Sequence, residues 1–333
     1  MIDLHLHLDG SLEPLEILKL ANISNVLLPT NDINELRELL TVQNDCTSLS
    51  EYLEKFALPQ MVLQTKETIE ESVYMLVVKL AKQGLCYAEI RFAPQLHLQN
   101  GLTQKQVVFA AVKGLKRGID TSGMQCQLIL CCMRGAENHR ENIETVYVAK
   151  DFLGKGVCAV DLAGNETAYP TRLFADIFKQ AKKDNIPITI HAGEAAGANS
   201  IKEALDLGAT RIGHGIHAIE DEEVLNQLKT KGVVLETCFT SNLQTKAVKN
   251  IDEYPILKFK DLGILTTVNT DNMTVSGTSL KKEYTLLKNL FSLTDETLKE
   301  LALIATTAAF LPEENKSILK ETITSTFLTW LYK

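Results

Sequence analysis

Short apolar segments alternate with amphipathic segments along most of the chain. Eight of the apolar segments have the length and the β-branched composition of buried strands, and we predict strands at 2–8, 87–92, 126–133, 157–162, 186–190, 211–213, 233–237 and 264–269. The segments between them carry apolar residues at helical spacing, as at 104–118, 141–153, 172–183, 201–207 and 221–231. Strands that alternate with helices in this way form a parallel sheet, so the pattern predicts an α/β fold.

The number of strand–helix units distinguishes the two common forms of such a sheet. Eight units in 333 residues favour a closed (β/α)8 TIM barrel over an open doubly wound sheet. No Gly-x-Gly-x-x-Gly pattern follows the first strand to support the open form. Additional helices are expected after the first strand and at the C-terminus, where 283–291, 296–310 and 315–332 should pack on the outside of the barrel. No linker-like segment interrupts the chain, so we predict a single domain over residues 1–333.

Composition narrows the class of partner. The formal net charge is -8 and no long basic block occurs, which argues against nucleic acid or an anionic membrane surface and favours a small-molecule substrate. No apolar run is long enough to cross a bilayer, and the chain opens directly on its first strand without a basic leader. Seven cysteines without paired spacing indicate reduced thiols, so we expect a cytoplasmic protein.

Two of the predicted strands end in histidines and carboxylates. The first strand alternates, with leucines on one face and His5, His7 and Asp9 on the other. A surface hairpin strand can show the same pattern, but two inward histidines are costly to desolvate unless something binds them. The fifth strand runs into His191-Ala-Gly-Glu194, which taken alone also fits an ordinary histidine at a turn.

In a parallel barrel the carboxyl ends of all strands share one face, so these groups should converge there with those that end the other strands: Asp161, Gly164, His214, Asp271 and Asn272. Buried groups of this kind would be destabilising without a shared charge. We predict that His5, His7, His191 and Asp271 bind one zinc ion per chain, although iron, cobalt or nickel would accept the same ligands. Such a metal lowers the pKa of a bound water to about 7.

Two further residues have predicted roles in catalysis. Glu194 lies beside His191 without being needed as a ligand, so we expect it to carry protons. His214, in Gly213-His-Gly215, should orient the attacking hydroxide or stabilise the charge that develops.

Other polar residues receive structural interpretations. His217 is expected at the rim of the site, and His97 and His139 at the surface. Glu89 and Arg91 share the inward face of the second strand, and we expect them to form an ion pair inside the barrel in preference to a substrate clamp.

The polar segments, taken together, resemble those of the adenosine deaminase family of metal-dependent amidohydrolases. The likeness runs from residue 2 to about residue 280, and the motifs that carry it, in order and spacing, lie at 1–11, 161–166, 191–194, 213–215, 241–242 and 269–272. The resemblance implies zinc on His5, His7, His191 and Asp271, with Glu194 protonating purine N1 and His214 acting on the hydroxide. It also implies that His7, Asp9, Gly164 and Asn272 bind substrate.

Within that resemblance, Gly164 would donate its N–H to purine N3 and Asp9 would accept from the ribose. Family members that use adenine typically have glutamate where this chain has Asp9, so the shorter side chain favours a nucleoside. Many members have aspartate at the position of Asn272, which faces purine N7. A neutral amide can donate to N7 without being protonated first, so Asn272 fits a purine.

The expected reaction is therefore hydrolytic deamination of adenosine, and of 2′-deoxyadenosine, within purine salvage. One alternative is an adenine deaminase or another aminopurine-directed amidohydrolase with the same metal site. Another alternative, from a different class, is a catalytically silent purine-binding or growth-signalling relative, which would lack a ligand or the glutamate. This chain lacks neither.

Overall fold

The computed structural model describes residues 1–43 and 46–333 and has eight parallel strands at its centre. They pair in chain order as two four-stranded sheets, β1-β2-β3-β4 and β5-β6-β7-β8. Bridges Val160–Ile188 and Leu6–Asp271 join the two sheets at both seams, which closes the barrel. The strands are β1 (Ile2–His7), β2 (Tyr87–Phe92), β3 (Gln125–Met133), β4 (Val157–Ala163), β5 (Thr189–Ala192), β6 (Arg211–His214), β7 (Val234–Thr237) and β8 (Thr266–Val268). The predicted TIM barrel is confirmed.

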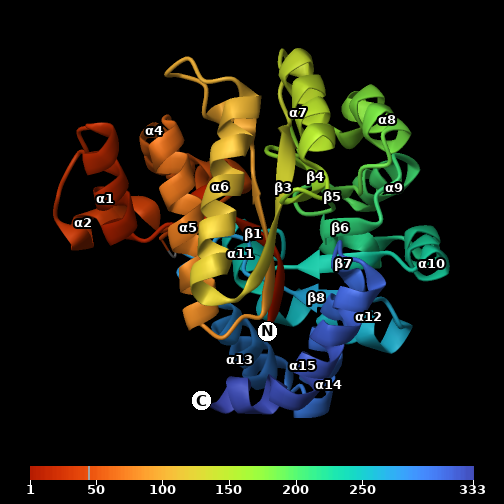
Figure 1. Ribbon diagram of the computed structural model, residues 1–333. Coiled ribbons are helices and arrows are strands. Elements are labelled where there is room, and N and C mark those ends of the chain that lie inside the picture. The colour runs from red at the N-terminus through yellow and green to blue at the C-terminus, as the bar shows by residue number, and fades with distance from the viewer. Residues whose placement is uncertain (44–45) are drawn as a thin grey trace.

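Helices surround the barrel between successive strands (Figure 1). After β2 they are α6 (Gln104–Ser122), α7 (His139–Phe152), α8 (Ala175–Lys183), α9 (Ala198–Asp206), α10 (Glu222–Lys231), α11 (Phe239–Gln244) and α12 (Ile256–Leu262). The expected helices after β1 are α1 (Pro14–Ser24), α2 (Ile33–Leu40), α3 (Leu49–Leu53), α4 (Ala57–Val62) and α5 (Lys66–Lys82). Among residues 1–43 and 46–333, no helix has the length and apolar character needed to cross a membrane.

The C-terminal helices gather at the end of the molecule where the N-terminus lies (Figure 1). They are α13 (Leu280–Phe291), α14 (Asp295–Ala308) and α15 (Glu313–Tyr332). The α14–α15 junction also contacts charged groups inside the barrel, which the sequence did not predict. The Phe310 N–H donates to Glu89 at 2.7 Å, and the Phe310 ring lies 3.8 Å from the guanidinium carbon of Arg211. Charged groups inside the barrel need such partners because water cannot reach them.

Charged side chains fill the inside of the barrel, while the apolar faces of the strands pack against the helices. The expected Glu89–Arg91 pair was wrong, because each residue pairs across the barrel instead. Glu89 pairs with Arg211 at 2.6 Å, and Arg91 pairs with Asp161 at 3.0 Å and Glu236 at 2.9 Å. Residues two apart on one strand point the same way, so groups from other strands meet their charges more directly.

Strand ends differ slightly from the predicted positions. β5 begins at Thr189 and reaches Ala192, so His191 lies within the strand and not beyond it. Pro187 has no N–H to give to a strand ladder, but its carbonyl still accepts from Val160 at 3.0 Å. Asp9 does not continue β1, because a short 3-10 turn (Asp9–Ser11) starts there.

Candidate active site

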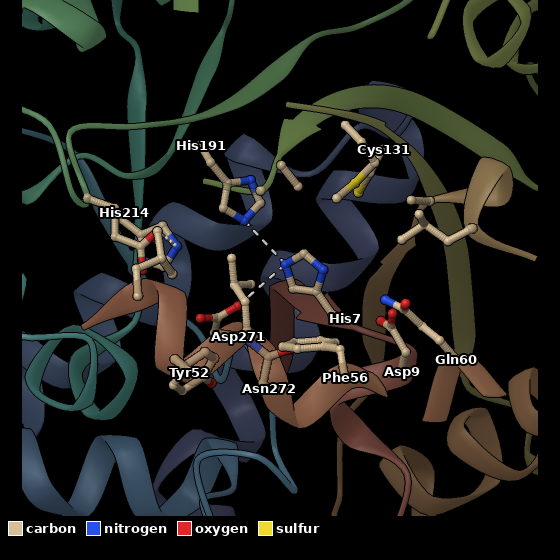
Figure 2. A pocket seen from close by; sticks show the side chains of 18 residues that line it. His7, Asp9, Tyr52, Phe56, Gln60, Cys131, His191, His214, Asp271 and Asn272 are labelled. Carbon is tan, nitrogen blue, oxygen red and sulfur yellow. Dashed lines mark hydrogen bonds and ion pairs between the residues drawn. The ribbon is translucent and has the colours of Figure 1, made fainter. Parts of the chain in front are cut away.

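Buried histidines and an aspartate meet at the carboxyl ends of the strands. His5, His191, His214 and Asp271 each offer one donor atom, and these atoms lie within 4.8 Å of one another. His7 adjoins this group, with its Nε2 at 3.2 Å from His191 Nε2 and 3.4 Å from Asp271 Oδ1 (Figure 2). The fold therefore brings together all four predicted ligands and His214, from β1, β5, β6 and the end of β8.

Carboxylates behind two of the histidines determine which ring nitrogen faces the cluster. His5 Nδ1 lies 2.8 Å from Glu236, and His191 Nδ1 lies 2.9 Å from Asp161. A carboxylate only accepts, so each Nδ1 carries the proton and each Nε2 keeps its lone pair toward the cluster. His5 Nε2 is buried and has no hydrogen-bond partner. An orphaned acceptor at this point fits a metal ion.

His214 has the opposite arrangement. The Asn242 amide donates to His214 Nδ1 at 3.0 Å, so in the neutral ring the proton is on Nε2. Burial lowers the pKa of His214 well below its usual value, which keeps the ring neutral. Its Nε2 lies 3.6 Å from Glu194. His214 is therefore placed to donate a hydrogen bond, although its distance from the other groups would also allow it to be a ligand.

The distances between the other four groups suit a tetrahedral ion. Zinc with ligand bonds of about 2.0–2.2 Å holds its ligand atoms about 3.3–3.6 Å apart in a tetrahedron. The spacings of 3.2 Å between His7 and His191, 3.4 Å between His7 and Asp271, and 3.5 Å between His5 and Asp271 are close to that range. Ser241 donates to the other oxygen of Asp271 at 2.6 Å and so orients the carboxylate.

Electrostatics inside the barrel also favour a cation. The ion pairs linked to the histidines contain four carboxylates and two guanidinium groups, which leaves two unbalanced negative charges: Glu89, Asp161, Glu236 and Asp271 against Arg91 and Arg211. Burial lowers the pKa of His7 and of His191, so both are neutral, the form that binds metal. A divalent ion would balance the network.

Glu194 lies on the loop after β5, at the edge of the cluster. Its side chain is buried, and burial raises the pKa of its carboxyl well above the usual value, with the charges of Asp271 and Glu166 adding to the effect. A raised pKa favours the protonated carboxyl, which can deliver a proton to a bound substrate.

A cavity of about 280 Å³ leads from the cluster to Asp9 and Gln60 (Figure 2). Its walls combine apolar side chains with the polar groups predicted to bind substrate, as is usual for small-molecule sites. Gly164, at φ +104°, presents backbone to the cavity, and Asn272 lies where the lack of a side chain at Gly10 leaves room for its amide. Apolar side chains in the lining include Leu49, Leu53, Phe56, Leu96 and Met133. None of the described lining residues is lysine or arginine.

The sequence predicted the wrong environment for one histidine and did not reveal the roles of two residues that contact the site. His97 is buried, with Nδ1 at 2.9 Å from the Leu63 carbonyl, so the expected surface position was wrong. His139 is exposed and His217 is half-buried at the edge of the site, as expected. The roles of Glu236 and Asn242 were not found. A glutamate inside the apolar run at 233–238 was a usable signal, whereas nothing local to Asn242 indicated His214 as its partner.

Comparisons with known proteins identify the family. The family model for adenosine deaminase matches residues 1–326. The chain belongs to the adenosine deaminase family. An adenosine deaminase of Haemophilus ducreyi is 48% identical over 323 residues, which cover 96% of this chain and 94% of that protein. As an adenosine deaminase family member, the chain is an enzyme, a hydrolytic deaminase of the metal-dependent amidohydrolase type.

Two solved structures superpose on nearly the whole length of this adenosine deaminase family member. An adenine deaminase from Arthrobacter aurescens superposes with a TM-score of 0.88 at 27% identity, covering 97% of each chain. An Arabidopsis protein named ADAL, solved with GMP, gives a TM-score of 0.85 at 26% identity, covering 98% of this chain and 96% of that one. These neighbours act on or bind different purines, so the choice of substrate depends on the cavity.

Proposed function

We propose that this protein deaminates adenosine and 2′-deoxyadenosine to inosine and deoxyinosine, with release of ammonia, using one zinc ion. The observation that carries the proposal is the cluster of His5, His7, His191 and Asp271 beside a buried Glu194, with three distances between ligand atoms of 3.2–3.5 Å. Three imidazoles and one carboxylate are four donors that zinc accepts, and a fifth position would hold water.

The residues of the chain divide the chemistry between them. When bound, zinc supplies a Lewis acid that makes water nucleophilic at neutral pH. The Glu194 carboxyl gives its proton to purine N1, which makes C6 more electrophilic as water adds there and ammonia leaves. His214, with its proton on Nε2, donates a hydrogen bond to the attacking oxygen. Asn272 and the Gly164 N–H hold the base at N7 and N3.

The far end of the cavity favours a nucleoside over a nucleotide. Asp9 is buried there, and burial raises its pKa to about 6, while backbone N–H groups and the Gln60 side chain counter that shift. A hydroxyl can donate to this carboxylate, whereas a phosphate would bring like charge against it. No described lining residue is lysine or arginine, so a phosphate would find no counter-charge.

One of the similar solved structures is an adenine deaminase, so adenine deamination is the second candidate function. Asp9 favours the nucleoside, since its carboxylate lies at the end of the cavity remote from the metal cluster, where a ribose hydroxyl could donate to it (Figure 2). A free base has no hydroxyl to make this hydrogen bond.

We also propose a domain organisation, a cellular compartment and a metabolic role for the enzyme. Residues 1–333 would form one domain, which the interlocking of α14–α15 with the barrel supports. A reducing compartment such as the cytoplasm is supported by the spacing of the seven cysteines, which is not that of a disulfide framework. The reaction would serve purine salvage, with the nucleoside as the only partner we propose.

Ammonia release from a panel of substrates tests the proposal. Adenosine, 2′-deoxyadenosine, adenine and AMP are compared at equal enzyme concentration, with metal content measured on the same sample. We expect the two nucleosides to exceed adenine and AMP by at least about 10²-fold in kcat/KM, and a chelator to abolish the activity until zinc is restored. A preference for adenine would establish the second candidate, and no ammonia from any purine would indicate a silent relative.

A further inference from the structure

One buried carboxylate holds the loop that carries Glu194. Glu166 follows β4 and is only 2% exposed. Its Oε1 accepts from the Gly193 N–H at 2.7 Å, and its Oε2 accepts from the N–H groups of Glu194 at 3.0 Å, Ala195 at 2.7 Å and Ala196 at 3.0 Å. Four consecutive backbone donors therefore converge on one side chain.

These four donors precede α9 and are not part of a helix or strand. A buried N–H without a partner is costly, and hydrogen bonds to a carboxylate are stronger than those to a neutral acceptor. Glu166 consequently determines the path of the backbone at Glu194 more than the local sequence does.

Other side chains from the same region hold the two ends of the turn. Thr167 donates to the Ala195 carbonyl at 3.2 Å. Arg134 donates to the His191 carbonyl at 2.6 Å and to the Tyr169 carbonyl at 2.6 Å. Arg134, which follows β3, and Thr167, in the segment after β4, thus hold the turn on both sides, with Glu166 at its centre.

We infer that Glu166 is a positioning residue, which acts through the backbone of 193–196 to set the Glu194 carboxyl against purine N1. The inference rests on the proposed function. Glu166 does not line the cavity, so it has no direct contact with substrate. The distance of 3.6 Å between Glu194 and His214 is too long for a hydrogen bond, so that contact cannot fix the carboxyl by itself.

The charge of Glu166 acts in the same direction. A second carboxylate close to Glu194 disfavours its ionised form, which adds to the effect of burial on the pKa of Glu194. Glu166 would therefore hold both the position and the protonated state of the acid.

Glu166→Gln, made in the wild-type and in the Glu194→Gln enzyme, tests the inference. Glutamine keeps the size of the side chain, but its NH2 group replaces one of the two acceptor oxygens. This NH2 group must face at least one backbone N–H, so two donors face each other. In the wild-type enzyme we expect kcat for adenosine to fall about 10–100-fold with KM changed less than about 3-fold, because misplacement of a reacting group by about 1 Å costs on the order of 10²-fold. In the Glu194→Gln enzyme the same change should cost less than about 3-fold, since the group it positions is already gone.

Metal content and thermal midpoint are measured for every variant. Glu203→Gln is the matched control, because Glu203 accepts a backbone N–H from Arg172 at 2.9 Å but does not touch the Glu194 loop. The control should stay within about 2-fold of wild-type kcat.

An equal loss in both backgrounds would overturn the inference, because it would mean that Glu166 supports the fold and not the acid. An unchanged kcat in the wild-type background would overturn it too. If Glu166→Gln does not fold, Glu166→Asp, which keeps the charge but is one methylene shorter, is put through the same cycle with the same criterion. Wild-type enzyme that releases no ammonia from adenosine would instead refute the proposed function, and the inference with it.

Discussion

Replacing Glu236 by glutamine would keep the barrel filled but remove the acceptor that orients His5. One oxygen of Glu236 accepts from His5 Nδ1 at 2.8 Å and from Arg91 at 2.9 Å, and the other accepts from Arg211 at 2.6 Å and from Thr189 at 2.9 Å. Glutamine has one acceptor oxygen and a donor amide in place of the other. Whichever way the amide turns, an N–H faces another N–H in a buried site.

Two effects of this substitution can be estimated separately. Loss of the carboxylate behind a metal-binding histidine typically weakens metal affinity about 10–100-fold, or about 1.4–2.7 kcal/mol. Removal of one partner from a buried ion pair costs about 3–5 kcal/mol of folding free energy, because Arg91 and Arg211 stay buried with less counter-charge. We expect both losses in Glu236→Gln.

Chelator competition measures the zinc affinity, and urea unfolding of the metal-free enzyme measures the free energy of unfolding. Glu89→Gln is the matched control. Glu89 is as buried as Glu236 and pairs with Arg211 at 2.6 Å, while its other oxygen accepts from Tyr87 and from the Phe310 N–H and not from a histidine of the cluster. The control should lose stability to a similar extent and keep its zinc affinity within about 2-fold.

The two variants distinguish an effect of the His5–Glu236 hydrogen bond on zinc binding from an effect of barrel stability. Equal weakening of zinc binding in Glu89→Gln and Glu236→Gln would show that barrel stability, and not the His5–Glu236 hydrogen bond, controls the metal. Zinc affinity that stays within about 2-fold in Glu236→Gln would refute the role of this carboxylate altogether.

Three other substitutions give independent tests. Glu194→Gln should keep zinc and lower kcat on the order of 10²–10⁴-fold, because the amide has no proton to give to N1. Ammonia release and metal analysis of the variant check this, and near-normal turnover would contradict the role of Glu194 as the acid. Gly10→Ala would put a Cβ 1.9 Å from Asn272 Oδ1, so the amide must move, and we expect kcat/KM for adenosine to drop on the order of 10²-fold with zinc retained. Burial lowers the pKa of His97 from 6.5 to about 4, so the unfolded chain binds a proton that the folded chain refuses, and stability falls as pH drops from 6.5 toward 4. The amide of His97→Asn can still donate to the Leu63 carbonyl but does not titrate, so this variant should recover up to about 3 kcal/mol of the stability that is lost at low pH. Urea unfolding at pH 7 and pH 4.5 measures the difference, and a variant with the same loss of stability between the two pH values as the wild type would contradict the prediction.

Local pattern was enough for the architecture. Strand-length apolar runs separated by amphipathic segments depend on spacing alone, so the eight strands and the helices between them could be predicted from the sequence, with errors of a few residues at strand ends such as β5. The barrel then implied that His5, His7, His191, His214 and Asp271 share one face, because parallel strands all end on the same side.

Contacts between strands could not be predicted in the same way. Glu89 and Arg91 looked like partners because they are two residues apart, yet each pairs with strands that lie across the barrel. His97 looked solvent-exposed because it is a lone histidine in a loop segment, but its ring lies against the Leu63 carbonyl.

The sequence by itself determined the barrel and the set of residues at its mouth, because the alternation of strands and helices and the order of polar strand ends are properties of neighbouring positions. Only the tertiary structure decided how those residues are used. The carboxylates of Glu236 and Asp161 set the lone pairs of His5 and His191, and Asn242 sets the proton of His214. These hydrogen bonds join residues far apart in the chain, and their geometry depends on strand register and barrel closure, which no local pattern contains.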